Sequence, residues 1–122
     1  MKTEKFSLKK RIKSFGYAFA GIKKFLLSEH NARLHFIATI LVLIASLVYK
    51  VSNTEAIALA GMVGFVWVAE MFNTCIEKVM DFISEEQHPN IQFIKDVAAG
   101  AVLIASLTAL VTGLFIFIPK IL

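Results

Sequence analysis

The chain has 122 residues, enough for one domain, and a formal net charge of +4. It is 57% hydrophobic with a mean hydropathy of +0.72, above the range of ordinary water-soluble domains. A soluble protein with one buried helix would leave too many of these apolar residues exposed to water. We therefore expect an all-α membrane protein that forms a single domain over residues 1–122.

The first predicted element is an amphipathic helix over residues 8–27. Its apolar residues recur every three or four positions, and lysines occupy the other faces. A basic amphipathic helix of this kind is typical of a membrane surface with anionic lipids, although packing on a soluble core is an alternative. No apolar segment follows the first positive charges as it would in a cleavable signal peptide. The apolar positions are Leu8, Ile12, Phe15, Phe19, Ile22 and Leu26.

Three apolar segments follow, and we expect them to span the membrane over residues 31–50, 55–83 and 91–119. Thr54 is the expected N-cap of the second span, Pro89 marks a break before the third, and Pro119 closes it. Small residues at intervals of four predict a packing seam on the third span. Because three helices make a thin bundle, we also expect the chain to form an oligomer. The seam consists of Ala101, Ala105, Ala109 and Gly113.

The distribution of basic residues predicts the orientation in the membrane. Residues 1–33 hold nine of the thirteen Lys and Arg residues, whereas the loop after the first span holds only Lys50. The N-terminus is therefore expected in the cytoplasm, together with the segment from residue 78 to residue 96. The chain is predicted to be a multi-pass protein of a bacterial cytoplasmic (inner) membrane.

A stripe of polar residues runs along the second span, in the stretch GFVWVAEMFNTCIEKVMDFI. Glu70, Asn73, Glu77 and Asp81 are separated by offsets that fall on one helical face. A charge at the centre of a transmembrane helix is unfavourable by roughly 2.5–3.5 kcal/mol, so Glu70 needs an explanation. It suits a general base, and Glu77 suits a magnesium ligand, with Asn73 orienting either group. A polar face without chemistry is the alternative, and we favour it for Asp81.

Other polar residues near the ends of the spans are candidates for the same site. Glu29 precedes the first span and could reach the depth of Glu77. Lys95 could contact phosphates, although Lys95 and Asp96 would serve equally well as an anchor pair at the membrane interface. GYAFAGIKK has glycines at Walker-A spacing but lacks the required Lys, and EEQH lacks the second motif of a di-iron site. His30 and His35 are more typical of interfacial hydrogen-bonding residues than of metal ligands.

AEMFNTCIEKVMD, followed by HP and by KDVAAGAVLIAS, resembles the prokaryotic diacylglycerol kinases and their undecaprenol kinase branch. The family signature is E-x-x-N-[ST]-x-[IV]-E, then K-D and a run of small residues after a short loop. It matches Glu70, Asn73, Thr74, Ile76 and Glu77, then Lys95 and Asp96. The likeness covers nearly the whole chain, including the amphipathic start.

The resemblance implies a homotrimer with composite active sites between subunits, which transfers the ATP γ-phosphoryl group to a lipid hydroxyl. Glu70 would be the base that takes the hydroxyl proton, and Asn73 would support it. Glu29 and Glu77 would hold Mg²⁺ with the ATP phosphates. Because the sequence has Lys10 beside Arg11 at the family's basic position, it leaves open which of them contacts phosphate. The remaining nucleotide contacts would come from Tyr17, Glu86, His88, Lys95 and Asp96.

The predicted function is thus ATP- and Mg²⁺-dependent phosphorylation of undecaprenol or diacylglycerol at the inner membrane face. The C-terminal pattern looks more like the undecaprenol kinase branch, but apolar side chains do not distinguish the two lipids. The partners expected are ATP, the lipid alcohol and the bilayer, and no nucleic acid is expected. A small proton-coupled transporter that uses Glu70 is the alternative function. A purely structural membrane protein is weaker, because it leaves the buried Glu unexplained.

Overall fold

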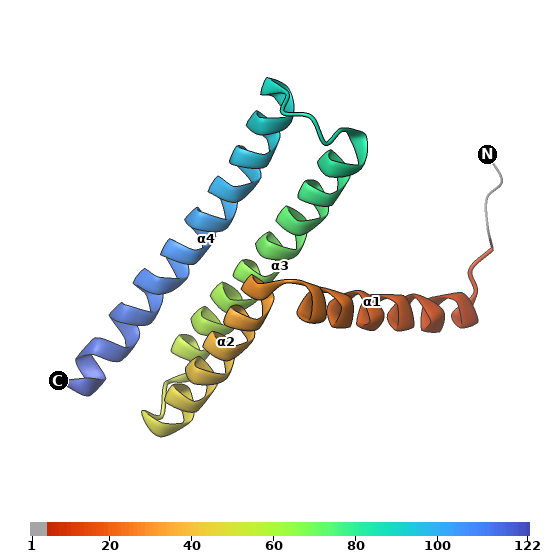
Figure 1. Ribbon diagram of the computed structural model, residues 1–122. Coiled ribbons are helices and arrows are strands. Elements are labelled where there is room, and N and C mark those ends of the chain that lie inside the picture. Colours follow the sequence, from red (N-terminus) through yellow and green to blue (C-terminus); the bar gives the residue numbers. More distant parts are fainter. Residues whose placement is uncertain (1–4) are drawn as a thin grey trace.

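A computed structural model describes residues 5–122, and within this range the chain is all-helical, as predicted (Figure 1). Its helices are α1 (Leu8–Ser28), α2 (His30–Val48), α3 (Asn53–Ile83) and α4 (Pro89–Ile121).

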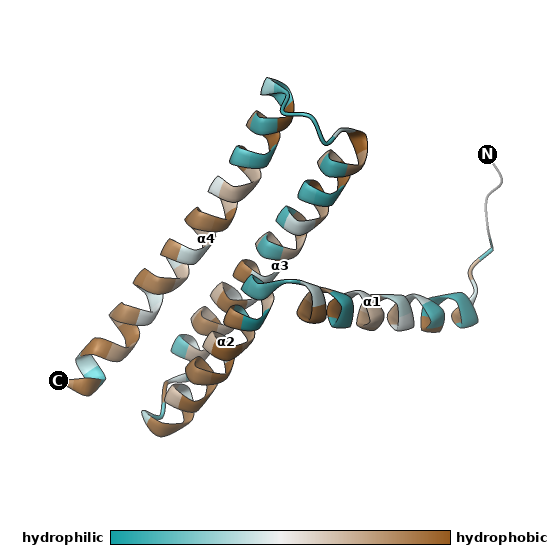
Figure 2. Ribbon diagram, viewed as in Figure 1, coloured by the Kyte–Doolittle hydropathy of each residue, from teal (hydrophilic) through white to brown (hydrophobic). Residues whose placement is uncertain are grey.

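Helices α2, α3 and α4 form an up-and-down bundle, and α1 points away from it (Figure 1). The most extensive packing is between the two long helices α3 and α4. Each of α2, α3 and α4 is long and apolar enough to cross a membrane. In Figure 2 hydrophobic residues predominate along most of these three helices, except near the α3–α4 connection, whereas α1 mixes hydrophobic and hydrophilic residues. We call the end of the bundle with the α3–α4 connection (residues 84–88) the loop end. The turn end is the one with the α2–α3 connection (residues 49–52).

The corner between α1 and α2 is held by one arginine. Glu29 has an extended backbone, which ends α1 and turns the chain into α2. The Arg33 guanidinium donates to the carbonyl oxygens of Leu26 at 3.3 Å and Leu27 at 2.7 Å. These carbonyls lie in the last turn of α1, where the helix itself provides no donors. Arg33 therefore stabilises the direction in which α1 leaves the bundle.

The turn end is built from two capping motifs. After α2, Lys50 adopts a left-handed conformation with φ of 51°, and the Val51 amide donates to the Ser46 carbonyl at 3.2 Å. At the start of α3, Ser52 and Glu55 form a capping box, with side-chain-to-backbone bonds of 3.1 Å and 2.9 Å. The expected N-cap, Thr54, is therefore wrong, because Ser52 takes that position.

Both prolines lie within α4. His88 is the N-cap, and its Nδ1 accepts a hydrogen bond from the Asn90 amide at 3.1 Å. Pro89 is the first helical residue, a favourable position because an N–H there has no partner in the helix. Pro119 lies in the last turn, and α4 continues to Ile121. The helix thus starts before the expected residue 91 and ends after residue 119.

Very few side chains are buried within a single chain. Of the predicted seam, Ala105 is fully buried, Ala101 is exposed, and Ala109 and Gly113 are half-buried. Most large apolar side chains point outward, as expected for helices that face lipid or another protein chain. The buried apolar residues are Phe25, Ala32, Leu59, Val66, Ala98 and Ala105.

Candidate active site

The polar stripe of α3 lies in its half nearer the loop end. Glu70 is 4% exposed and is the one buried charged residue in the described part of the chain. Glu77 lies two turns closer to the loop end, about 10 Å along the helix axis, and is half-buried. Glu70 thus lies next to the apolar part of α3, and Glu77 lies nearer its polar end.

Glu70 is hydrogen-bonded to a residue of α2. The distance from Glu70 Oε1 to His35 Nε2 is 2.9 Å. One turn further toward the turn end, the Trp67 indole N–H donates to Thr39 Oγ1 at 2.8 Å. These two contacts join α2 to α3 at matching heights. They fix the face that α2 presents to Glu70.

Asn73 lies between the two glutamates, as the spacing predicted. Its Nδ2 donates to Glu77 Oε1 at 3.3 Å. Its Oδ1 is buried and has no hydrogen-bond partner among the described residues. Because buried polar oxygens are normally hydrogen-bonded, this oxygen is available to a donor from a bound molecule.

Glu29 comes from the α1–α2 corner to the same region. Its Oε1 lies 3.9 Å from the Lys78 Nζ, and Lys78 directly follows Glu77 in α3. Glu29, Glu77 and Asn73 offer carboxylate and amide oxygens, the ligand type that Mg²⁺ prefers. No group of three or more His, Cys, Asp or Glu side chains suitable for a metal occurs in residues 5–122. Glu29 and Glu77 therefore form no complete metal site by themselves, and a magnesium ion there would need most of its ligands from phosphates and water.

The predicted nucleotide contacts at the loop end are partly engaged with neighbours. Lys95 Nζ lies 2.6 Å from Asp81 Oδ1, and Asp96 Oδ1 accepts from Gln92 Nε2 at 2.8 Å. The first contact agrees with the interhelical polar face favoured for Asp81. Glu86 and the N-cap His88 are exposed in the loop.

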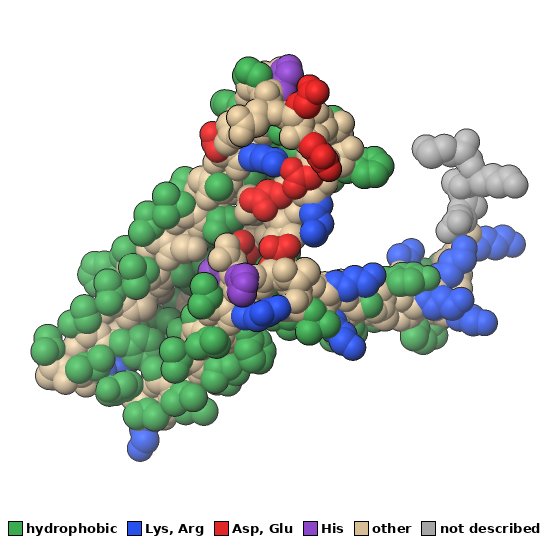
Figure 3. Space-filling model, in the orientation of Figure 1, with side chains coloured by type: hydrophobic (Ala, Val, Ile, Leu, Met, Phe, Trp, Pro, Cys, Tyr) green, Lys and Arg blue, Asp and Glu red, His purple; other side chains and the backbone are tan. Residues whose placement is uncertain are grey.

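The predicted contacts on α1 lie elsewhere. Lys10, Arg11 and Tyr17 belong to the helix that points away from the bundle (Figure 1). Figure 3 shows basic side chains spread along α1, and acidic ones gathered nearer the loop end. The Arg11 guanidinium lies over the Phe6 ring at 5.8 Å, and Tyr17 is 75% exposed. A single chain in this arrangement keeps α1 apart from the ends of α3 and α4.

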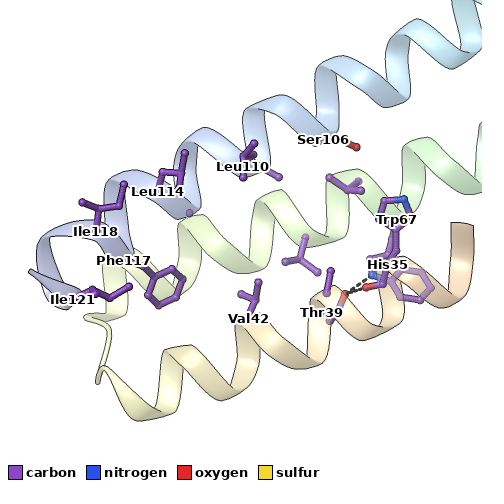
Figure 4. Close-up of a pocket in the computed structure, with 15 residues that line it drawn as sticks. His35, Thr39, Val42, Trp67, Ser106, Leu110, Leu114, Phe117, Ile118 and Ile121 are labelled. Atoms are coloured by element: carbon purple, nitrogen blue, oxygen red, sulfur yellow. Dashed lines mark hydrogen bonds between the residues drawn. The ribbon is translucent and has the colours of Figure 1, made fainter.

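An apolar groove of about 400 Å³ runs between α2, α3 and α4 toward the turn end. Figure 4 shows His35, Thr39 and Trp67 at one end of it, and Phe117 and Ile121 toward the other. Because His35 also bonds Glu70, the groove begins next to the buried carboxylate. Its walls include Val42, Leu110, Leu114 and Ile118.

The sequence did not predict the contact of His35 with Glu70. The sequence predicts that His35 forms a hydrogen bond at the interface, but it does not identify the partner. The available signal was that His35 lies in a first span that contains no Asp, Glu, Lys or Arg from Leu34 to Tyr49. The rotation of α2 relative to α3, which determines the partner, has no signature in the sequence.

The chain is similar to known proteins over most of its length. Residues 16–117 match the family described as prokaryotic diacylglycerol kinase. The chain is 34% identical to the undecaprenol kinase of Bacillus subtilis over 113 residues, which cover 93% of this chain and 92% of that protein. It is 31% identical to the diacylglycerol kinase of Escherichia coli K12, covering 83% of each chain. A diacylglycerol kinase of Synechocystis is 33% identical, over 89% of this chain and 63% of that longer protein.

These similarities extend from α1 to α4 and include the whole polar stripe of α3. This chain therefore belongs to the prokaryotic diacylglycerol kinase family.

Proposed function

We propose that the protein phosphorylates a membrane lipid alcohol with ATP and Mg²⁺, at the inner face of a bacterial cytoplasmic membrane. Family membership supports the lipid kinase activity. The observation that carries the proposal is the position of Glu70. This buried carboxylate has an apolar groove on one side and the polar residues of the loop end on the other. A lipid and a nucleotide, which come from different solvents, would meet at such a boundary.

Glu70 acts as the general base in this proposal. Its carboxylate accepts the proton of the lipid hydroxyl as the hydroxyl oxygen attacks the γ-phosphorus of ATP. The new O–P bond forms while the bond between the γ-phosphorus and the bridging oxygen breaks, and ADP leaves with that oxygen. The Asn73 carbonyl, which lacks a partner among the described residues, is available to accept a hydrogen bond from a donor on the substrate.

Glu29 and Glu77 would hold the magnesium ion. When bound, Mg²⁺ neutralises charge on the phosphates and aligns them for transfer. Asn73 donates to Glu77 and so holds that carboxylate in one orientation. The separation of about 10 Å between the positions of Glu70 and Glu77 on α3 leaves room for the phosphate chain.

ATP would contact Glu86, His88, Lys95 and Asp96 at the loop end, and Tyr17 with Lys10 or Arg11 on α1. Because α1 points away from the bundle, its residues would complete a site only if α1 moves or if another chain supplies it. We propose the second arrangement, in a homotrimer with sites between neighbouring subunits. The excess of Lys and Arg in residues 1–33 supports a cytoplasmic location for the N-terminus and for this site.

The groove supports a long apolar acceptor. It starts at His35 beside Glu70 and extends along the membrane-spanning helices, as the apolar tail of a lipid in the bilayer would require. Among the two candidate lipids we favour undecaprenol. The support is the identity of 34% to the Bacillus subtilis undecaprenol kinase over 92% of that protein, against 33% and 31% for the two diacylglycerol kinases.

The test is ATP-dependent phosphate transfer in mixed micelles. The purified chain is incubated with radiolabelled ATP and either undecaprenol or diacylglycerol, with and without Mg²⁺. We expect a labelled lipid that requires Mg²⁺, with undecaprenol as the better acceptor. Failure to label any lipid alcohol, together with proton-driven transport in proteoliposomes, would instead favour a transporter that uses Glu70.

A further inference from the structure

The buried carboxylate of Glu70 has one hydrogen-bond partner among the described side chains, the His35 imidazole. A carboxylate that acts as a base only accepts hydrogen bonds, so in that form of the site His35 Nε2 carries the hydrogen of this contact. A carboxylate buried without such a donor is strongly unfavourable. The contact therefore gives the buried carboxylate of Glu70 a fixed hydrogen-bond partner on α2.

The contact also makes the two carboxylate oxygens of Glu70 different from each other. Oε1 receives the His35 N–H at 2.9 Å, while Oε2 has no partner among residues 5–122. A carboxylate held through one oxygen cannot rotate freely about its last bond. The second oxygen is then aimed at a constant position, where an acceptor hydroxyl would be deprotonated.

The backbone of His35 lies beside a second contact between α2 and α3. Thr39 Oγ1 donates to the His35 carbonyl at 2.7 Å and accepts from the Trp67 indole at 2.8 Å. The Trp67 ring packs edge-on against Phe25 of α1, with centroids 6.2 Å apart. Three helices thus meet around the residue that holds Glu70. The His35 side chain is 23% exposed and lines the start of the apolar groove.

We propose that His35 is a positioning residue for the kinase reaction, which holds Glu70 through Oε1 and presents Oε2 to the lipid hydroxyl. The proposal rests on the role of Glu70 as the base, given under the proposed function. His35 touches Glu70 and the end of the groove, so its removal should affect the chemical step more than the binding of Mg-ATP. A misplacement of a catalytic group by about 1 Å can lower a rate by about 100-fold.

The experiment compares two substitutions of similar size. His35→Gln keeps an N–H donor that can reach Glu70, whereas His35→Leu removes it. We expect His35→Leu to lower kcat by about 100-fold with the KM for Mg-ATP unchanged. We expect His35→Gln to recover most of the lost kcat. His30→Gln is the matched control, since His30 is an exposed histidine of the same helix, and its kinetics should equal those of the wild type.

A second measurement separates this proposal from the one on which it rests. In a Glu70→Gln background, His35→Leu should cause no further loss of the residual rate, because no base remains to be positioned. If Glu70→Gln is fully active, the proposed role of Glu70 is wrong. If Glu70→Gln is inactive while His35→Leu keeps normal kcat, the role of His35 is overturned and that of Glu70 stands. Equal losses in His35→Leu and His35→Gln would also overturn positioning by a hydrogen bond.

Discussion

Helix α3 carries acidic residues in both halves, but the two halves differ in how fully the chain supplies hydrogen-bond partners for these residues. At the turn end, Glu55 accepts the Ser52 amide at 2.9 Å and lies 3.0 Å from Lys120 Nζ of α4. The Ser52 hydroxyl accepts the Glu55 amide in return. Every partner comes from the chain itself, so Glu55 has a structural role.

In the half of α3 nearer the loop end, the polar groups are not fully satisfied by the chain. Glu70 is buried with a single partner, and the buried Asn73 Oδ1 has none among the described residues. Glu29 and Glu77 approach the same region without forming a closed cluster. Buried oxygens that lack partners are unfavourable unless a ligand supplies them.

An acidic residue in a membrane helix is therefore not by itself a sign of catalysis. Glu55 and Glu70 are the same residue type on the same helix. They differ in burial and in the hydrogen-bonding capacity left over after folding. This difference leads to predictions that distinguish the two ends by kinetics and by stability.

The largest effect is expected for Glu70→Gln. The amide can still accept the His35 N–H, but it cannot accept a proton from the lipid hydroxyl. We expect kcat for lipid phosphorylation to fall by about 10²–10⁴-fold. Glu55→Gln, the matched control at the turn end, should leave kcat unchanged in the same micellar assay. Equal losses in the two variants would refute the comparison.

The next effect is expected for Glu77→Gln, which removes one carboxylate from the proposed magnesium site. The Mg²⁺ concentration for half-maximal activity should rise by about 10–100-fold. At saturating Mg²⁺, much of the wild-type kcat should return. The control is Glu85→Gln, since Glu85 is exposed at the start of the α3–α4 loop. A Mg²⁺ requirement unaltered in Glu77→Gln would exclude Glu77 as a ligand.

A smaller effect distinguishes the two interpretations of Lys95. If Lys95 contacts the nucleotide, Lys95→Met should raise the KM for ATP by about tenfold, as expected for the loss of one charged hydrogen bond. Asp81→Asn breaks the same 2.6 Å ion pair from the other side, and the KM should stay near the wild-type value. Similar kinetics in both variants would instead mean that Lys95 and Asp81 only anchor α4 to α3.

Much of the architecture could be predicted from the sequence. The apolar segments predicted three long helices, and the periodicity of Leu8 to Leu26 predicted the amphipathic α1. Residues at offsets of three and four share a helical face, so the spacing predicted that Asn73 could contact either Glu70 or Glu77, and in the structure it contacts Glu77. These features are local, because each depends on residues in one helix.

Contacts between helices could not be predicted in the same way. The His35–Glu70 bond joins residues 35 positions apart and depends on how α2 is rotated against α3. The direction of α1 depends on Arg33 and the extended Glu29, and it decides whether Lys10 and Tyr17 approach the nucleotide. Neither the His35–Glu70 bond nor the direction of α1 is indicated by a periodic pattern in the sequence.

The N-terminus of α3 was a different kind of error, because its signal was present. The segment SNTE has the S-x-x-E pattern of a capping box. Thr54 is also a common capping residue, but the pattern of Ser52 and Glu55 is the stronger signal. In the structure Thr54 is exposed and lies inside the first turn of α3.

The smallest effect, on stability alone, follows from this correction. Ser52→Ala removes the side-chain acceptor of the capping box and should lower the free energy of unfolding by about 1 kcal/mol. Thr54→Ala should leave that free energy unchanged or slightly higher, because Ala favours the helix. Both are measured by denaturant titration in detergent micelles. Because the turn end has no catalytic role in the proposal, kcat and KM should match those of the wild type in both variants. A loss of kcat in Ser52→Ala without a loss of stability would show that the two ends of α3 are functionally coupled.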